Sequence, residues 1–176
     1  DDWQYDETKI LDKNLLKSNK VGSIGLSIYD EYAIPDNKIN FLQIPGNLFN
    51  QKILKSKKLH KFINGGGLIH VRSIFIQGLL LMDLEKIPSN LKKLYQPLQE
   101  FHLLCKKTNH DPITIATNFI KEFLPSFKLV IGVDSPTQFD QIIKKINAEI
   151  EPNTLSKAIK IGEKYKDNLW DPRNWK

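Results

Sequence analysis

Cysteine, methionine and arginine are nearly missing from this sequence of 176 residues, and each scarcity excludes something. A single cysteine, Cys105, forms neither an internal disulfide nor a zinc site built from several thiolates. The chain is therefore compatible with a reducing compartment, and we expect a cytoplasmic location. Apolar runs such as Ser73 to Met82 are far shorter than the ~20 residues that cross a bilayer, so no membrane contact is expected.

The only methionine is Met82, so Asp1 is not a translation start. The opening residues are acidic, unlike the basic and then apolar start of a signal peptide. Two interpretations stay open: an upstream segment has been removed, or the sequence begins in mid-chain. The mass of 20.4 kDa and the hydrophobic content of 40% fit one domain over residues 1–176.

Arginine accounts for only two of the 26 basic residues, Arg72 and Arg173, although the formal net charge is +6. Proteins that read nucleic acids favour arginine for its planar, bidentate fork. The lysines come mostly in pairs between apolar residues at helical spacing, which indicates solvated helix faces. A basic nucleic-acid-binding module is therefore the least favoured hypothesis, and we expect no nucleic-acid partner.

Four apolar runs have the length of strands: residues 21–28, 39–44, 68–75 and 128–133. They are continuous rather than alternating, which is typical of parallel strands covered by helices. Helical patterns precede, separate and follow them, and the last covers about residues 153–167. Alternation of the two kinds of element predicts an α/β fold with right-handed crossovers and an extra C-terminal helix.

Two helix starts carry sequence signals. Asp111 followed by Pro112 predicts an N-cap and a proline in the first helical position. Residues 135–138 predict a capping box, with Ser135 as the cap and Gln138 reaching back. Another helix is marked by an apolar stripe at Leu91, Leu94, Leu98, Phe101, Leu104 and Cys105.

The strand segments resemble the aldo/keto reductase family. Residues 25–29 (GLSIY) resemble its fifth strand and residues 42–49 (LQIPGNLF) the sixth strand with its turn. Residues 71–80 (VRSIFIQGLL) resemble the seventh, and residues 130–138 (VIGVDSPTQ) the eighth strand and the helix that grips the cofactor. The resemblance runs from about residue 11 to the end. It implies half of a TIM-type (β/α)8 barrel, with about four parallel strands and flanking helices.

The resemblance covers the cofactor-binding half of that barrel and no catalytic residue. The family's catalytic aspartate, tyrosine, lysine and histidine lie on the first four strands. Candidate side chains such as Tyr29, Asp30, His60, His70 and His102 do not sit in those motifs. We therefore assign no catalytic residue and no metal ligand, and expect the chain to be inactive alone.

The resemblance implies that Ser27 and Gln43 hydrogen-bond the nicotinamide carboxamide. Ile28 stands where the family usually has an asparagine, which removes one polar partner. Satisfaction of local backbone groups at the strand ends is the alternative role of Ser27 and Gln43.

Arg72 stands where many family members place an aromatic residue against the nicotinamide. A guanidinium in an apolar strand must be paired or face a cleft, because its burial alone is costly. Stacking on a ring, pairing with a phosphate or carboxylate, and a buried ion pair with an aspartate all stay open. Ser73 matches a serine near the cofactor's diphosphate.

The region after the fourth strand is implied to hold the adenosine end of NADP or NAD. Gly132 and Gln138 stand where many members carry the lysine and arginine that bind the 2′-phosphate, so discrimination for NADP should weaken. The helix start at Ser135 still offers free N–H groups to an anion. Gln138 is expected at a ribose or phosphate and Gln141 at the adenine. A plain amphipathic helix is the alternative.

Half a barrel has consequences, because about eight strands are needed to close one. We expect two unpaired strand edges. Between the first two strands, over residues 29–38, we expect a turn or a single helical turn in place of the helix that the family usually has there. An inner face without an opposite wall is expected from Ile24, Leu26, Leu42, Ile44, Ile69, Val71 and Ile131.

Two functions remain in view besides nucleic-acid binding. The first is the C-terminal part of an oxidoreductase that transfers hydride from a nicotinamide cofactor to a small carbonyl substrate. Its missing N-terminal half then comes from an upstream segment, another chain or a second copy. The second is a non-catalytic half-barrel that binds a ligand or oligomerises.

Overall fold

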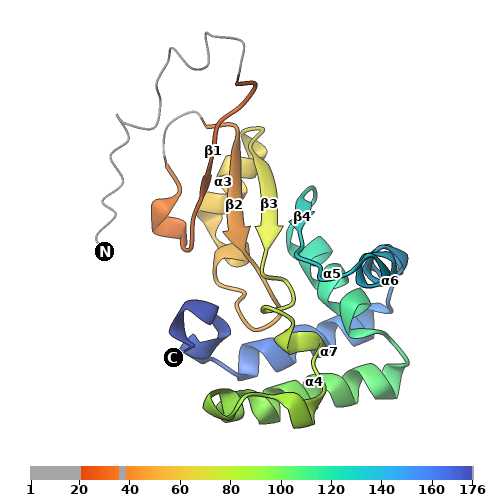
Figure 1. Ribbon diagram of the computed structural model, residues 1–176. Coiled ribbons are helices and arrows are strands. Elements are labelled where there is room, and N and C mark those ends of the chain that lie inside the picture. Colours follow the sequence, from red (N-terminus) through yellow and green to blue (C-terminus); the bar gives the residue numbers. More distant parts are fainter. Residues whose placement is uncertain (1–20, 36–38, 176) are drawn as a thin grey trace.

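The computed structural model describes residues 21–35 and 39–175 (Figure 1). The helix expected before the first strand lies outside these residues. One parallel sheet has the order β1-β2-β3-β4. Its strands are β1 (Gly25–Ser27), β2 (Phe41–Pro45), β3 (Leu68–Arg72) and β4 (Lys128–Val130). The prediction of four parallel strands in an α/β fold is confirmed.

The strands are shorter than predicted. β3 ends at Arg72 instead of residue 75, because Ser73 has a φ of 62° and turns the chain out of the extended conformation. β4 ends at Val130 instead of residue 133. β1 and β4 are each paired on one side only within the described residues, so the sheet has two free edges, as expected.

In the described part of the chain, five α-helices accompany the sheet: α3 (Lys57–Asn64), α4 (Tyr95–Thr108), α5 (Pro112–Phe123), α6 (Pro136–Ile146) and α7 (Pro152–Lys164). The last corresponds to the extra C-terminal helix. No helix in the described part of the chain is long and apolar enough to cross a membrane. Short 3-10 turns fill the connections: η1 (Glu31–Ala33), η2 (Ile53–Lys55), η3 (Leu79–Leu81), η4 (Leu84–Lys86), η5 (Ser89–Leu94), η6 (Asn168–Trp170) and η7 (Pro172–Asn174).

The local sequence signals are largely confirmed. The Asp111 side chain accepts a hydrogen bond from the amide of Ile113 at 2.9 Å, as an N-cap should. The single 3-10 turn η1 lies between β1 and β2, where the sequence predicted a turn or a single helical turn instead of a longer helix. The predicted stripe from Leu91 to Cys105 is buried throughout, although its first two members lie in η5 rather than in α4.

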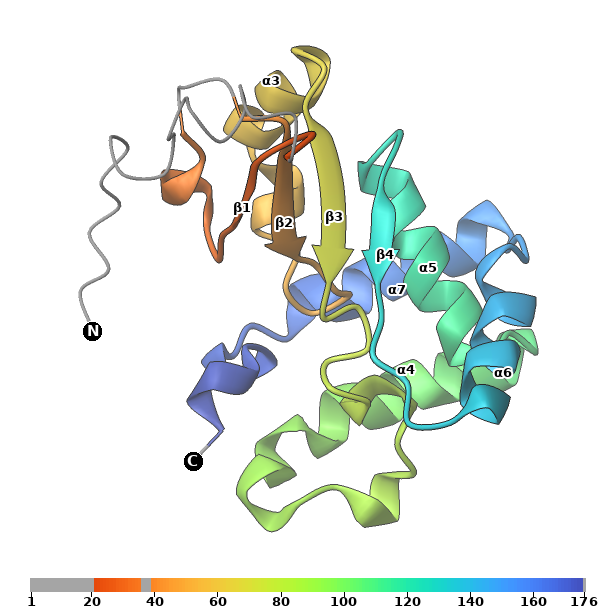
Figure 2. The same ribbon diagram turned by 45° about the horizontal axis from the view of Figure 1, so that its top comes forward.

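The assignment of apolar strand residues to an inner face is wrong. Leu42, Ile44, Ile69 and Val71 are each at most 2% exposed and belong to the core that the sheet shares with the helices. They point to the helix side because, among the described residues, the helices on that side supply the apolar partners. Figures 1 and 2 show α3 behind β1 and β2, and no helix in front of the sheet. Three other members of the expected face, Ile24, Leu26 and Ile131, are only half-buried.

The opposite side of the sheet, which we call the open face, carries the alternate residues. Paired residues of neighbouring parallel strands point to the same face, so the register identifies its members. Two of them, Phe41 and His70, stack their rings with centres 4.8 Å apart. Leu68 is 54% exposed. The strand residues of the open face are Gly25, Ser27, Phe41, Gln43, Pro45, Leu68, His70, Arg72, Lys128 and Val130.

The C-terminal segment after α7 packs against the body of the molecule. The Trp170 ring stacks on Phe49 with centres 4.0 Å apart, and its indole N–H donates to the Tyr165 carbonyl at 3.0 Å. Trp170 is 2% exposed. The tail therefore reaches the carboxyl ends of the strands and contributes to that edge.

Candidate functional site

The carboxyl ends of β1, β2 and β3 bring together three side chains expected from the sequence. All strands of a parallel sheet end at the same edge, where α/β folds bind ligands. Ser27 is the last residue of β1, and Arg72 is the last residue of β3. Gln43 lies in β2 directly beside Ser27 in the register. All three belong to the open face.

Ser27 and Gln43 form a hydrogen-bonded pair. The Ser27 hydroxyl donates to Oε1 of Gln43 at 3.1 Å. Ser27 is exposed and Gln43 is half-buried. The amide Nε2 of Gln43 has no hydrogen-bond partner among the described residues. That Nε2 group faces the open side of the sheet and is available to a carbonyl oxygen of a ligand.

Arg72 stacks on a ring of its own chain. Its guanidinium carbon lies 4.2 Å from the centre of the Tyr29 ring, and Nη2 donates to the Ile28 carbonyl at 3.3 Å. No carboxylate oxygen of the described residues lies within 4 Å of this guanidinium. The buried ion pair that the sequence left open is therefore not formed in the described part of the chain. One face of a half-buried cation remains available to an anion or a planar ring.

Sequence reasoning missed two residues beside Arg72. The guanidinium carbon of Arg173 lies 3.5 Å from the same Tyr29 ring centre. Asp171 accepts from Nε of Arg173 at 3.0 and 2.8 Å, and this pairing lowers the pKa of the Asp171 carboxyl. Arg72 adds a weaker electrostatic effect in the same direction. No local pattern in the sequence reports this contact, because it joins residues far apart along the chain.

Ser73 begins a tight turn at the same edge. Its φ of 62° is followed by 53° at Ile76, 52° at Gln77 and 85° at Gly78. Non-glycine residues rarely adopt this left-handed conformation, and such strain is often found at ligand-binding sites. The Ser73 carbonyl accepts a hydrogen bond from the amide of Ile76 at 3.0 Å. Ser73 itself is half-buried and directly follows β3.

The remaining expected residues form a second group at the start of α6. The Ser135 hydroxyl accepts from the amide of Gln138 at 3.2 Å. Oε1 of Gln138 accepts from the amide of Asp134 at 2.7 Å, one residue before the position a capping box uses. The Gln138 side chain is therefore engaged in the cap, although its Nε2 group is not. Gly132 and Gln141 are exposed, and a Cβ on Gly132 would have open space around it.

No hydrogen bond or ring contact joins the two groups within the described residues. A cavity of about 860 Å³ lies elsewhere, beside the C-terminal segment, lined by Phe49, Gln51, Gly162 and Trp170 among others. None of the expected cofactor residues lines it. The candidate site is thus an open edge rather than an enclosed pocket. The described residues contain no cluster of three metal-ligating side chains.

The fold and the site together define a half-barrel α/β protein. Solved structures with the same fold are aldo-keto reductases. The aldose reductase of Giardia lamblia superposes with a TM-score of 0.61 at 12% identity, over 93% of this chain and 52% of its own. An aldo/keto reductase of Brucella melitensis gives 0.54 at 13% identity, over 85% and 51% of the respective chains. MGS-M4, an aldo-keto reductase from a Medee basin deep-sea metagenome library, gives 0.52 at 15%, over 90% and 56%.

This chain therefore spans about half the length of the enzymes whose fold it shares. That coverage is consistent with the C-terminal half of the reductase barrel. No protein-family model and no curated protein sequence matches the chain. At identities of 12–15% the likeness concerns the fold, and function has to be argued from the site.

Proposed function

We propose that this chain is the cofactor-holding half of a nicotinamide-dependent carbonyl reductase. The observation that carries the proposal is the Ser27–Gln43 pair beside Arg72 at the carboxyl edge of the sheet. Amide and hydroxyl groups at strand ends suit a nicotinamide carboxamide, which has one acceptor and two donors. The shared fold with aldo-keto reductases supports the same assignment.

The residues present fit a nicotinamide dinucleotide. Gln43 offers an unpartnered N–H group to the carboxamide oxygen, and the Ser27 hydroxyl orients that amide by donating to its oxygen. Arg72, lacking a carboxylate within 4 Å in the described residues, offers its charge and planar face. The bound cofactor would supply the hydride. The chain's own residues hold the ring at the open face, where the other half of the barrel would enclose it.

The adenosine end of the cofactor is proposed to lie at the start of α6. The Thr137 amide in the first turn of α6, which has no hydrogen-bond partner among the described residues, and the exposed side-chain amide of Gln141 provide neutral donors there. No lysine or arginine occupies positions 132 and 138. We therefore propose that NADP and NAD bind with similar affinity.

Catalysis is proposed to require the missing half. The proton donor and the substrate pocket would come from strands that this chain lacks, so a small carbonyl compound is a substrate only of the completed barrel. An association function without chemistry is the second candidate. The exposed Phe139 and Ile143 side chains on α6, beside a free strand edge, favour it.

The test is a titration of the purified chain with NADPH, followed by nicotinamide fluorescence. We expect saturable binding and no oxidation of NADPH by any aldehyde. Gln43→Ala should weaken binding by about three- to tenfold, the value of a neutral hydrogen bond. Gln99→Ala, an exposed amide on α4, is the matched control and should leave binding unchanged. Absence of binding in the wild type, or equal effects of both variants, would contradict the proposal.

A further inference from the structure

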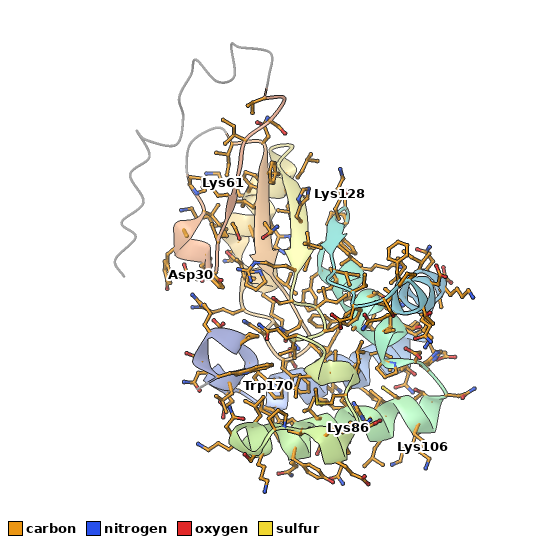
Figure 3. The ribbon with its side chains drawn as sticks, viewed as in Figure 1. Asp30, Lys61, Lys86, Lys106, Lys128 and Trp170 are labelled. Carbon is orange, nitrogen blue, oxygen red and sulfur yellow. The ribbon has the colours of Figure 1, made fainter. Side chains whose placement is uncertain are left out.

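The cavity of about 860 Å³ beside the C-terminal segment, which we call the tail cavity, lies between two separate stretches of this chain. One wall is the connection from β2 to α3, over residues 49–55, and the other is the end of α7 with the segment up to Asn174. Figure 1 shows that connection reaching α7, and Figure 3 labels Trp170, which stacks on Phe49. The volume is in the range of small-molecule sites.

Close contacts hold the two walls of the tail cavity together. Gly162 of α7 lies so near the Leu48 carbonyl that a Cβ on it would be 1.8 Å from the carbonyl oxygen. The Lys55 ammonium group pairs with Glu163 of α7 at 2.6 Å. Walls fixed in this way form the cavity before a ligand arrives, so binding does not have to order them.

Gln51 places an unsatisfied polar group in the wall of the tail cavity. The residue is only 7% exposed, and its Nε2 group donates to the carbonyls of Leu48 and Ile159 at 2.8 and 3.1 Å. Its Oε1 atom is buried and accepts no hydrogen bond from the described residues. A buried acceptor without a donor costs free energy. An O–H or N–H group supplied from the cavity would remove that cost, which points to a polar occupant.

Lys52 and Lys166 line the tail cavity with two ammonium groups that no carboxylate of the described residues approaches within 4 Å. Lys52 lies in the wall between β2 and α3, with its ammonium group 5.3 Å from the Tyr32 ring centre. Lys166 lies in the other wall, just after α7. Two ammonium groups from the two walls suit a phosphate, which lysine binds as a point charge.

The three carboxylates of the lining are already engaged by other groups. Glu163 is held by Lys55, as described. Asp171 accepts from Nε of Arg173 at 3.0 and 2.8 Å. Asp167 has no cation within 4 Å among the described residues, and it accepts from the Leu169 amide at 2.8 Å. The two lysines without partners therefore outweigh the one carboxylate without an ion pair, and the tail cavity favours an anion.

The rest of the lining favours hydroxyl groups over a flat aromatic ring. Phe49 and Trp170 are only 6% and 2% exposed and stack on each other, so they leave little ring surface for a ligand. The side-chain amides of Asn50 and Asn168 line the tail cavity and make no hydrogen bond within the described residues. An amide both donates and accepts, and so does a hydroxyl group, which makes the two complementary.

We propose that the tail cavity binds a phosphorylated polyol. The phosphate binds the ammonium groups of Lys52 and Lys166, and the hydroxyl groups bind the amides of Asn50 and Asn168. The tail cavity shares no lining residue with the cofactor site proposed above, so this proposal does not rest on that function. All of the residues that it uses belong to this chain, and no second half-barrel is needed to test it.

The test is a calorimetric titration of the purified chain with myo-inositol 1-phosphate, a rigid polyol phosphate that has no carbonyl group to reduce. We expect one site with a dissociation constant below about 1 mM. Added salt should weaken the binding, because the lysines are exposed. Free myo-inositol and inorganic phosphate each carry only part of the recognised groups, and each should bind at least about tenfold more weakly.

Exposed residues provide the variants, so the core stays intact and circular dichroism checks each fold. Lys52→Ala and Lys166→Ala should each weaken binding by about tenfold or more, as loss of a bond to a charged group would. Asn168→Ala should weaken the binding of myo-inositol 1-phosphate about three- to tenfold and leave that of inorganic phosphate unchanged. The matched control is Lys160→Ala, on α7 but outside the tail cavity, which should bind like wild type.

Three results would overturn the proposal. No binding of myo-inositol 1-phosphate would show that the tail cavity does not take a polyol phosphate. Equal affinity for inorganic phosphate would reduce the tail cavity to a site for any small anion. Equal losses in Lys160→Ala and Lys166→Ala would show attraction to the basic surface in general. Binding of NADPH is measured separately, and its outcome leaves each of these results unchanged.

Discussion

The guanidinium of Arg72 lies over the Tyr29 ring, with its carbon 4.2 Å from the ring centre. Arg173, from the other end of the chain, approaches the same ring at 3.5 Å. The two arginines therefore tie the C-terminal segment to the carboxyl edge of the sheet. Only Arg173 has a carboxylate partner, Asp171, among the described residues. Because of that difference, we propose different roles for them: Arg173 anchors the tail, and Arg72 binds a ligand.

Replacement of Arg72 should weaken the binding of NADPH more than it affects folding. We expect Arg72→Leu to raise the dissociation constant about tenfold or more, as loss of a hydrogen bond from a charged group would. Arg72→Lys should not restore binding, because an ammonium group lacks the planar fork. The control is Lys52→Ala, which removes a cation 5.3 Å from the Tyr32 ring. Equal affinity of Arg72→Leu and wild type would contradict the role of Arg72.

Gly162 should be irreplaceable by alanine. A Cβ at this buried position of α7 would lie 1.8 Å from the Leu48 carbonyl oxygen, and a backbone atom cannot easily move away. We expect Gly162→Ala to lower the free energy of unfolding by about 1–3 kcal/mol or more. Gly132→Ala, where no atom lies within 4 Å, should change it by less than about 0.5 kcal/mol. Urea denaturation of both variants makes the comparison.

Acid should release the C-terminal segment through Asp171. Arg173 lowers the pKa of the Asp171 carboxyl in the folded protein. The Asp171 carboxyl therefore binds a proton more readily in the unfolded chain than in the folded protein. As a result, the Asp171–Arg173 pair stabilises the fold at pH values above the ordinary aspartate pKa of about 3.9. That contribution is lost as the pH falls below this value. Asp171→Asn should be less stable than wild type at pH 6, and the difference should shrink near pH 3. A difference that does not change with pH would refute the linkage.

Cys105 should resist thiol reagents in the folded protein. Burial raises the pKa of this thiol to about 12, and the side chain is 6% exposed. Almost no thiolate then exists at pH 8, and thiolate is the reactive form. We expect modification by a chromogenic disulfide to be slow in buffer and complete within minutes in denaturant. Rapid reaction of the native protein would show that α4 does not hold Cys105 as described.

Local signals predicted much of this fold. The N-cap at Asp111 and the cap at Ser135 were readable because each depends on a few consecutive residues. The parallel order of the strands was readable from continuous apolar runs between helical patterns. The strand ends were not, because the left-handed Ser73 that stops β3 looks like any serine in the sequence.

The faces of the sheet were assigned wrongly for a physical reason. An expected barrel suggests that apolar strand residues point inward, but Leu42 and Val71 face the helices, which form the apolar layer next to the sheet in the described part of the chain. The polar members Ser27 and Gln43 consequently occupy the open face. The contacts of Tyr29 with Arg72 and Arg173 join distant parts of the chain, and no local pattern reports them.

The most direct test of the account follows backbone and side-chain amides of the labelled chain by NMR during titration with NADPH. We predict shifts for the Gln43 side-chain amide and for the backbone of Ser27, Arg72 and Ser73, together with the start of α6 near Gln138. Amides of α4 should stay unchanged. Shifts confined to the cavity near Trp170, or none at saturating NADPH, would contradict the claim that the carboxyl edge of this half-barrel holds a nicotinamide cofactor.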